Sequence, residues 1–332
     1  MTEIVEAEAL KQVLNDWQNT INLRLAEISS DAQPDILYEP IRYVLQGGGK
    51  RIRPILLLLT CKALNGDIEL CWEAAVAVEL LHNFTLVHDD IMDKDDTRRG
   101  RQTVHKKWNE DTALLVGDGL LALAYQALLR TRSPRIQTIA QIFTDGMLEL
   151  CEGQALDLEF ETRNEVHLDE YLTMIQKKTA RLLSVAAQIG AFIADGNPDD
   201  VTAVRDFGFH LGCAFQIQDD LLDITTTEEI LGKTHGSDII RKKKTFLLIH
   251  ALEHADAETK KRLDEIVNHS TIENLLLKEV LSIYELTGSI AAAKTSVANY
   301  FASAENDLSK LKDSPAKNDL RSLVQFIASR EN

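Results

Sequence analysis

The chain has 332 residues, of which 36 are lysine or arginine and 52 are aspartate or glutamate, giving a formal net charge of −16. This charge argues against a general nucleic-acid or anionic-membrane binder, because such proteins usually present a basic surface. The chain is 45% hydrophobic, carries no linker-like stretch and shows little strand-like alternation, so we expect one all-α domain over residues 1–332.

The sequence also limits where the protein can reside. Its four cysteines are scattered without a Cys-x-x-Cys pair, which is typical of buried thiols in a reducing compartment. Residues 1–30 show no signal-peptide pattern, and the longest strongly apolar run, residues 55–59, is far shorter than the roughly 18 residues of a spanning helix. We therefore expect a soluble, cytoplasmic protein without a transmembrane segment.

Helical periodicity runs through most of the chain, with breaks that contain glycine, proline or asparagine. Helices are expected over residues 5–29, 36–46, 54–64, 70–93, 111–131, 135–160, 168–194, 199–224, 244–253, 258–268, 272–287, 289–311 and 316–329.

The break before residue 54 reads Gly48-Gly49-Lys50-Arg51-Ile52-Arg53-Pro54. Backbone amides freed by the glycines, together with three cations, would form an anion-binding site, and Pro54 suits the first position of the next helix. A plain basic loop between helices is the alternative. The order of glycines and lysine is not that of a Walker A loop.

The segment 70–93 is apolar nearly all round between Trp72 and His88, which predicts a central helix buried on most sides. It ends in the first acidic cluster, Asp89-Asp90-Ile91-Met92-Asp93. Two carboxylates four residues apart share a helix face, and at 4 Å near a protein surface they repel by about 4 kcal/mol. One such cluster alone is usually a solvated acidic face.

Cations and a histidine accompany this first cluster. Arg98-Arg99-Gly100-Arg101 follows it, and adjacent arginines can bind two different anions through bidentate contacts. An ion pair with Asp95 or Asp96 is the alternative interpretation. His82 lies seven residues before Asp89 on nearly the same helix face, where a core histidine is the more common outcome.

The segment 199–224 ends in the second acidic cluster, Asp219-Asp220-Leu221-Leu222-Asp223. Mg²⁺ prefers one or two carboxylates plus substrate phosphate oxygens. Two carboxylate rows at the ends of buried helices therefore predict metals that clamp a phosphorylated substrate at the mouth of a helical bundle. Further cations occur at Lys178, which precedes Thr179 within a helix, and at Lys233 and Lys243 beyond the second cluster. A lone lysine is usually solvated.

Several strings occur in order between about residues 47 and 245: GGGKRIRP, ELLHNFTLVHDDIMDKDDTRRG, GQALDL, QKKTA, FQIQDDLLD, and GKTHGSD with KKKT. Together they resemble the motifs of the trans-prenyl diphosphate synthases. The resemblance implies the isoprenoid-synthase fold, a single helical bundle with a central apolar cavity, and a homodimer. It also implies a prenyltransferase that condenses isopentenyl diphosphate with allylic diphosphates, using Mg²⁺ with three ions per active site.

The resemblance assigns roles to individual residues. Mg²⁺ would be held by Asp89, Asp90, Asp93, Asp219, Asp220 and Asp223. The allylic diphosphate would contact Arg98, Lys178, Lys233 and Lys243, with Thr179 and Gln216 along the allylic group; Arg98, Lys178, Thr179 and Gln216 are the predicted catalytic residues. The diphosphate of isopentenyl diphosphate would be bound by Lys50, Arg53, His82 and Arg99, with Gly49 shaping the loop.

Product length would depend on Leu81, Phe84 and Thr85. The family pattern of one aromatic residue five positions before the first aspartate implies geranylgeranyl diphosphate (C20), with farnesyl diphosphate (C15) as the alternative. On an ideal helix Thr85 lies about 40° from Asp89, whereas Phe84 lies about 140° away and is aimed partly towards a neighbouring helix. Plain core packing of Phe84 is therefore also open.

Three other functions compete with this one. A terpene cyclase would share the fold and the first cluster, but it usually replaces the second cluster and has no use for GGKRIRP. A non-catalytic subunit of a synthase should have lost residues from one motif, and none is missing. A purely structural acidic bundle would leave the ordered motifs unexplained.

Overall fold

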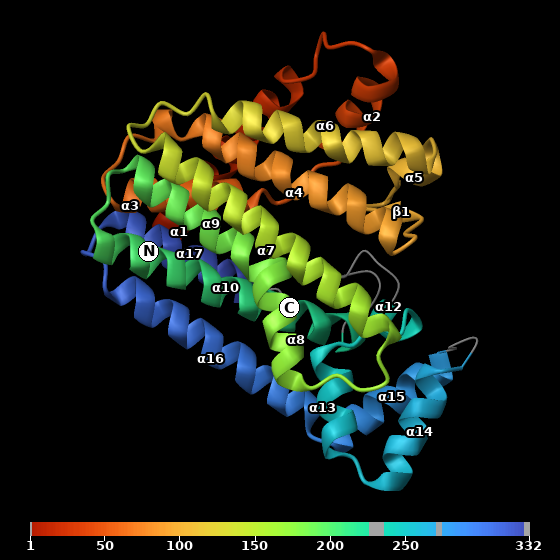
Figure 1. Ribbon diagram of the computed structural model, residues 1–332. Helices are drawn as coiled ribbons and strands as arrows, with labels where there is room; N and C mark the ends of the chain where they lie inside the picture. Colours follow the sequence, from red (N-terminus) through yellow and green to blue (C-terminus); the bar gives the residue numbers. More distant parts are fainter. Residues whose placement is uncertain (1, 226–235, 270–273, 329–332) are drawn as a thin grey trace. The chain divides into compact units, whose positions relative to one another are not determined.

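The computed structural model describes residues 2–225, 236–269 and 274–328, and these residues are almost entirely helical (Figure 1). The all-α prediction is confirmed. Packing divides the chain into two compact units. Unit 1 comprises residues 1–147, 185–205 and 310–322, and unit 2 comprises residues 148–184, 206–309 and 323–332.

The first part of unit 1 is built around one apolar helix, α4. Its elements are α1 (Thr2–Glu27), α2 (Asp35–Leu45), α3 (Ile52–Ala63), the 3-10 helix η1 (Ile68–Leu70), α4 (Trp72–Met92), strands β1 (Thr97–Arg98) and β2 (Arg101–Gln102), α5 (Val104–Lys107) and α6 (Glu110–Leu128). Helix α4 packs against α1, α3 and α6, and Figure 1 shows α4 and α6 side by side. An apolar surface on nearly all sides lets several helices cover α4 at once, so the predicted central helix is confirmed.

A two-stranded antiparallel hairpin, which the sequence did not predict, follows α4. Arg98 pairs with Arg101 across the ladder, and the two turn residues Arg99 and Gly100 have φ values of 52° and 72°. Two successive positive φ angles define the type I′ turn, whose twist matches that of paired strands. Two-residue strands rich in arginine show no apolar alternation, which is why the sequence pattern indicated only a break.

The predicted helix over residues 168–194 is interrupted by a π-helical turn. The elements between residues 136 and 225 are α7 (Ile136–Thr162), α8 (Leu168–Ile175), the π-helical turn η2 (Gln176–Ala180), α9 (Arg181–Ile193) and α10 (Pro198–Thr225). Lys178 and Thr179 both lie in η2, and π-helical turns often mark functional sites. Helix α10 begins at Pro198, whose missing N–H costs nothing at a first helical position.

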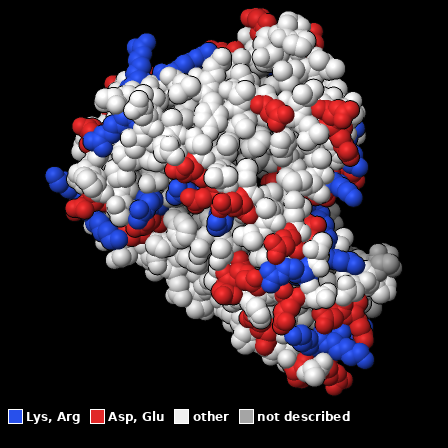
Figure 2. Space-filling model, in the orientation of Figure 1, with Lys and Arg blue, Asp and Glu red and all other residues white. Residues whose placement is uncertain are grey.

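Several helices of unit 2 pack around α13. The remaining elements are α12 (Ser237–Ile240), α13 (Phe246–His254), α14 (Ala257–Val267), α15 (Asn274–Leu286), α16 (Ser289–Ser309) and α17 (Pro315–Ala328), of which α17 has residues in both units. Helix α13 packs against α15 and α16 over a buried core that includes Tyr171, Phe246 and Tyr284. Acidic and basic side chains are intermixed over α14 and α15 (Figure 2, lower right), where Arg262 Nε lies 2.6 Å from Glu279 Oε1.

The three longest helices, α1, α7 and α10, all carry charged side chains. Within the described ranges, no helix combines the length and the apolar character needed to cross a membrane.

Candidate active site

The glycine loop, residues 47–51, connects α2 to α3 in unit 1. Gly48 and Gly49 have φ values of 73° and 132°, which glycine adopts readily because it lacks a Cβ. A Cβ on Gly49 would lie 2.9 Å from the guanidinium carbon of Arg99, and Arg99 donates a hydrogen bond to the Gly48 carbonyl. The loop is therefore closed against the turn of the hairpin, and its backbone angle favours glycine at position 49.

Two of the predicted anion-binding residues, Arg53 of α3 and His82 of α4, are in contact. Arg53 Nη1 lies 3.2 Å from His82 Nε2. Because arginine can only donate, Nε2 accepts and the ring proton is on Nδ1. Burial, followed by the charge of Arg53 and neighbouring arginines, lowers the pKa of His82 well below its usual value, and burial lowers the pKa of Arg53 to about 10. The imidazole is therefore neutral at neutral pH.

The expectation that three cations of the glycine segment face an anion is wrong for Arg51. Lys50 is exposed, but only 3% of Arg51 is accessible to solvent, and its Nη1 lies 2.5 Å from Glu79 Oε1 of α4. Glu79 is itself 2% exposed within an otherwise apolar helix. A lone buried glutamate in an apolar run requires a partner, and this is the signal by which the sequence could have indicated the pair.

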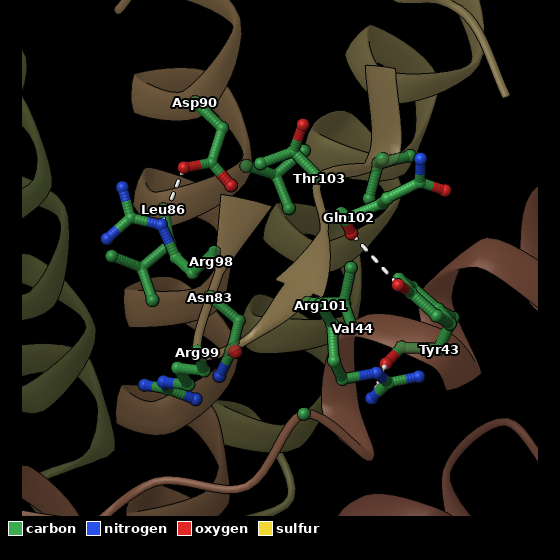
Figure 3. Close-up of a pocket in the computed structure, with 13 residues that line it drawn as sticks. Tyr43, Val44, Asn83, Leu86, Asp90, Arg98, Arg99, Arg101, Gln102 and Thr103 are labelled. Carbon is green, nitrogen blue, oxygen red and sulfur yellow. Dashed lines mark hydrogen bonds and ion pairs between the residues drawn. The ribbon is translucent and has the colours of Figure 1, made fainter. Parts of the chain in front are cut away.

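The hairpin is anchored to α2 by Tyr43, which lines a pocket together with hairpin residues (Figure 3). Tyr43 Oη donates to the Gln102 carbonyl at 2.9 Å, and Arg101 Nη1 donates to the Tyr43 carbonyl at 3.0 Å. The guanidinium of Arg101 and the ammonium of Lys107 lie 3.8 and 3.9 Å from the centre of the Tyr43 ring. Two cations this close to the ring centre are attracted to its π-system, and Arg101 thereby helps to fix the hairpin on α2.

The first acidic cluster spans the last turn of α4, and its three aspartates have different surroundings. Asp90 is buried and accepts a 2.5 Å hydrogen bond from Arg98 Nε, drawn in Figure 3, whereas Asp89 and Asp93 are partly exposed. Burial raises the pKa of Asp90 to about 6, with Asp95 and Asp89 adding to the rise and Arg98 opposing it. Arg98 also bonds Asp95 at 3.2 Å. The alternative of a local ion pair for Arg98 is thus correct for Asp95, and the sequence missed Asp90 as the closer partner.

The residues predicted to control product length lie one to two turns before this cluster. Leu81 is fully buried, and Thr85 Oγ1 donates to the His82 carbonyl at 2.8 Å. The Phe84 ring is 8% exposed and packs edge-on against His88 with ring centres 4.8 Å apart. His88 lies against α6 at Gly117, where a Cβ would come within 2.0 Å of its Nε2. Phe84 therefore lies on a face of α4 that it shares with a residue packed against a neighbouring helix.

The second acidic cluster lies in unit 2, near the end of α10. Asp220 accepts hydrogen bonds from Tyr171 Oη (2.6 Å), the Phe246 amide (3.1 Å) and Gln216 Nε2 (3.1 Å). Burial raises the pKa of Asp220 to about 7, with Asp238 adding to the rise and these hydrogen bonds opposing it. Asp223 is also buried and accepts from Ser237 Oγ (2.7 Å) and the Asp238 amide (3.0 Å), whereas Asp219 is partly exposed.

The predicted catalytic residues of unit 2 are connected by hydrogen bonds. Thr179 Oγ1 donates to Gln216 Oε1 at 2.8 Å, and Gln216 in turn donates to Asp220. Lys178 Nζ lies 2.5 Å from Asp157 Oδ2 of α7. A Cβ on Gly153 would lie 2.4 Å from the Lys178 amide, so this glycine allows α7 to approach η2 closely.

Not every predicted residue can be placed, and the sequence missed others. The half-buried Lys243 follows α12, where its amide donates to the Asp238 carbonyl at 2.9 Å, and Lys233 lies outside the described residues. Tyr171 and Tyr43, which hold Asp220 and the hairpin, were missed, since nothing in the spacing of a lone tyrosine indicates a distant partner. Asp157 could have been found, because it lies in the GQALDL string.

An all-α protein with two Asp-Asp-x-x-Asp clusters at helix ends, and with arginines around the first, has the features of an enzyme that acts on diphosphate esters. The chain belongs to the polyprenyl synthetase family, whose profile matches residues 34–284, and it is a prenyltransferase. The predicted family resemblance is thus confirmed, and the family favours prenyl transfer over the structural-bundle and cyclase alternatives.

Individual relatives agree over nearly the whole chain. The short chain isoprenyl diphosphate synthase of Methanothermobacter thermautotrophicus is 37% identical over 321 residues, which is 96% of this chain and 98% of that protein. The geranylgeranyl diphosphate synthase of Methanosarcina mazei is 37% identical over 316 residues, covering 94% and 95% of the two chains. The crystal structure of a geranylgeranyl pyrophosphate synthetase from Pyrococcus horikoshii superposes with a TM-score of 0.93 at 37% identity, covering 97% and 98%.

Proposed function

We propose that this protein is a Mg²⁺-dependent trans-prenyltransferase that condenses isopentenyl diphosphate with allylic diphosphates, with geranylgeranyl diphosphate as its main product. One observation carries the proposal. His82, in contact with Arg53, stands on α4 seven residues before Asp89, which is about 10.5 Å along a helix and nearly on the same face. A rigid helix thus fixes the distance between an anion-binding group and an acidic cluster, as the joining of two diphosphate-bearing substrates requires.

The six aspartates of the two clusters are proposed to hold three Mg²⁺ ions on the allylic diphosphate. The partly exposed Asp89, Asp93 and Asp219 would bind metal directly, while the buried members position them. Within the described part of the chain, no group of three or more His, Cys, Asp or Glu side chains is arranged to hold a metal alone. Such sparse carboxylates fit Mg²⁺, which takes one or two of them plus phosphate oxygens and water. Bound Mg²⁺ would stabilise the negative charge of the departing diphosphate.

In the proposed reaction, the bond between C1 of the allylic chain and its diphosphate oxygen breaks, and the electron pair leaves with the diphosphate. The terminal double-bond carbon of isopentenyl diphosphate then bonds to C1, and a proton is lost from its C2. The departing diphosphate would be held by Arg98, Lys178, Lys233 and Lys243, and would accept that proton. Lys50, Arg53, His82 and Arg99 would hold the diphosphate of the second substrate.

Thr179 and Gln216 would lie along the allylic group and orient it. Their side chains are held in a directional chain, because Thr179 donates to Gln216 and Gln216 donates to Asp220. Dipoles that are fixed before the reaction do not need to reorganise when charge develops in the transition state. Lys178 would exchange or share its Asp157 partner on binding the diphosphate.

The activity is tested by mass spectrometry of products formed from isopentenyl diphosphate with dimethylallyl, geranyl or farnesyl diphosphate. We expect Mg²⁺-dependent release of diphosphate and a C20 product. No turnover with any of the three starters over a full Mg²⁺ titration would refute the proposed function.

Product length is proposed to depend on Phe84, with farnesyl diphosphate as the alternative product. The small Thr85 at the next position and the names of the geranylgeranyl diphosphate synthases among the relatives support C20. Phe84→Ala removes the ring that packs on His88, so we expect longer products, again measured by mass spectrometry. An unchanged product distribution would instead assign Phe84 to core packing.

A homodimer is proposed because α6 exposes two leucines, Leu114 (49%) and Leu115 (57%), that a second copy would cover. Light scattering with size exclusion should give twice the chain mass for the native protein and one chain mass for Leu115→Glu. Leu286→Glu, at a leucine of α15 that is 77% exposed, is the matched control and should remain dimeric. A native monomer would rule the dimer out.

We propose further that both units form one catalytic domain over residues 1–332, since the family match at 34–284 runs through both. The four cysteines are not joined in disulfides, which supports the proposal of a cytoplasmic location. Fractionation of cells that produce the protein would test the location.

A further inference from the structure

We propose that Arg51 is a positioning residue, which fixes the glycine loop through Glu79 so that Lys50 and Arg53 face the diphosphate of isopentenyl diphosphate. This inference rests on the proposed function for the identity of the substrate. It separates the three cations of the glycine segment into two that bind the anion and one that holds the others in place.

Arg51 is unavailable as a substrate ligand because three of its nitrogens are bonded inside the protein. Its Nη1 lies 2.5 Å from Glu79 Oε1, its Nε 2.9 Å from Asn22 Oδ1, and its Nη2 3.1 Å from the Leu45 carbonyl. These partners belong to α4, α1 and the last residue of α2, so one side chain joins three helices to the start of α3. Only 1% of the Arg51 side chain is exposed, which leaves no path for an incoming anion.

The backbone of Arg51 also depends on this pair. Its φ of 51° lies in the left-handed region, which is unfavourable for a residue with a Cβ, and it immediately precedes α3. The buried contacts of the side chain compensate for that conformation and thereby set the angle between the loop and the helix. Lys50 is the preceding residue and Arg53 lies in the first turn of α3, so both are oriented by the dihedral angles at Arg51.

Two further contacts show that the loop is held rather than free. Gln18 Nε2 of α1 donates to the Gly49 carbonyl at 2.7 Å, one helical turn before Asn22, which bonds Arg51. Asn83 Nδ2 donates to the Glu79 carbonyl at 2.7 Å and to Glu79 Oε1 at 3.3 Å, which restrains the carboxylate. In Figure 3 Asn83 and Arg99 lie close together at the end of the pocket nearest the loop.

The charge of the pair matters as well as its geometry. Burial lowers the pKa values of Arg53 and Arg99, and the carboxylate of Glu79 opposes that fall, which helps to keep both guanidiniums charged. Arg51 in turn neutralises Glu79, so that the carboxylate does not repel a bound diphosphate. The pair is therefore neutral as a whole and adds no net charge next to Lys50, Arg53 and Arg99, which are proposed to bind the substrate.

The test is a double-mutant cycle with Arg51→Met, Glu79→Leu and the combined variant. Each single change should raise the KM for isopentenyl diphosphate by about tenfold or more and leave the KM for the allylic diphosphate within about twofold. The double variant should recover most of the lost Tm, since apolar residues can replace a buried ion pair. Its KM for isopentenyl diphosphate should nevertheless stay high. Recovery of Tm and KM together, or an equal rise in both KM values, would overturn a positioning role.

Lys317→Met is the matched control. Lys317 is a buried cation of the same unit, bonded to the Leu311 carbonyl at 2.7 Å and to Asp313 at 2.9 Å, and neither bond involves the glycine loop. The variant should lower Tm without changing the KM for isopentenyl diphosphate. A comparable rise in that KM would attribute the Arg51 effect to general destabilisation.

Calorimetric titration with inorganic diphosphate in the presence of a chelator separates this inference from the proposed function. Without divalent metal, diphosphate binding should depend on the lysines and arginines of the protein, among them Lys50, Arg53 and Arg99, and not on the acidic clusters. Arg51→Met/Glu79→Leu should bind diphosphate about tenfold more weakly than the native protein even if no condensation activity is found. Equal affinity would overturn the inference while leaving the proposed reaction standing.

Discussion

The two acidic clusters share one sequence pattern, but different groups stabilise their buried carboxylates. In unit 1, Asp90 is buried against the guanidinium of Arg98, and the arginines around α4 help to hold the pKa of His82 down. In unit 2, Asp220 is buried against three neutral donors, and its carboxylate adds to the burial that raises the pKa of Tyr171. A cation therefore stabilises the buried carboxylate of the first cluster, and hydrogen bonds from neutral groups stabilise that of the second.

This difference indicates how the two regions depend on metal. Burial raises the pKa of both carboxyls, to about 6 for Asp90 and about 7 for Asp220, and only at Asp90 does a guanidinium oppose it. The region of α4 already carries the positive charge that an anion needs. At the second cluster neutral donors, and not a guanidinium, contact the buried carboxylate of Asp220, so we expect diphosphate binding there to depend more strongly on added cations.

The largest effect is expected from Asp89→Asn and Asp219→Asn, which alter the partly exposed aspartates. Each should lower kcat by on the order of 10²–10³, as expected for losing a group that stabilises the leaving diphosphate. Stability in urea should change by less than about 0.5 kcal/mol. If metal dependence follows the charge difference, Asp219→Asn should need the larger increase in Mg²⁺ for half-maximal rate. A kcat within tenfold of the native value would exclude that aspartate as a metal ligand.

The free energy of unfolding should differ between variants of the two buried aspartates, Asp90 and Asp220. Asp90→Asn removes the closer of the two carboxylate partners of Arg98 and leaves Asp95, and because Arg98 is also 35% exposed the expected cost is about 2 kcal/mol rather than the larger values of fully buried pairs. Asp220→Asn should cost about 1 kcal/mol, because its partners are neutral. The Asn carbonyl can keep the bonds from Tyr171 and the Phe246 amide, and the Gln216 amide can turn its oxygen towards the new NH2 group. Urea unfolding measures both, and the reverse order would contradict this difference between charged and neutral partners.

The sequence predicted those elements that are determined by residues close to one another in the chain. Helix α4 and the end of α10 were predictable because a long apolar run followed by aspartates defines both the helix and where it ends. The hairpin and the π-helical turn were not, since Arg98–Arg101 shows no strand alternation and QKKTA continues a helical pattern without a break.

Contacts between segments distant in sequence account for the features of the site that the sequence did not predict. The inward direction of Arg51 depends on Asn22, Leu45 and Glu79, which belong to three other helices, and only the isolated Glu79 could have indicated that a buried partner existed. The same holds for Asp220, whose partner Tyr171 lies 49 residues earlier. A motif thus predicts which residues are present at a site, whereas the fold decides which of them face the substrate.

Tyr171→Phe tests the neutral stabilisation of the second cluster directly. The change removes one of three donors to Asp220, so we expect a loss of about 1.5 kcal/mol, within the range for a hydrogen bond to a charged group. Tyr284→Phe is the control, because it removes a fully buried hydroxyl from the same core that is not bonded to Asp220. Equal losses from the two variants would show that burial of a hydroxyl, and not its bond to Asp220, is what matters.

The smallest expected effect concerns the positive field of unit 1 and is seen in the pH dependence of stability. His82 has a lowered pKa in the folded protein, so below its usual value near 6.5 the unfolded chain takes up a proton that the folded protein does not. Stability that is present above pH 6.5 is therefore lost as the pH falls, by less than about 1 kcal/mol at pH 6. His82→Gln should flatten the dependence of Tm on pH between 7 and 5.5. His250 of α13, whose pKa burial also lowers, contributes a slope of the same sign that should remain in the variant. An unchanged slope would mean that His82 titrates normally and that the arginines around it do not produce the field inferred for unit 1.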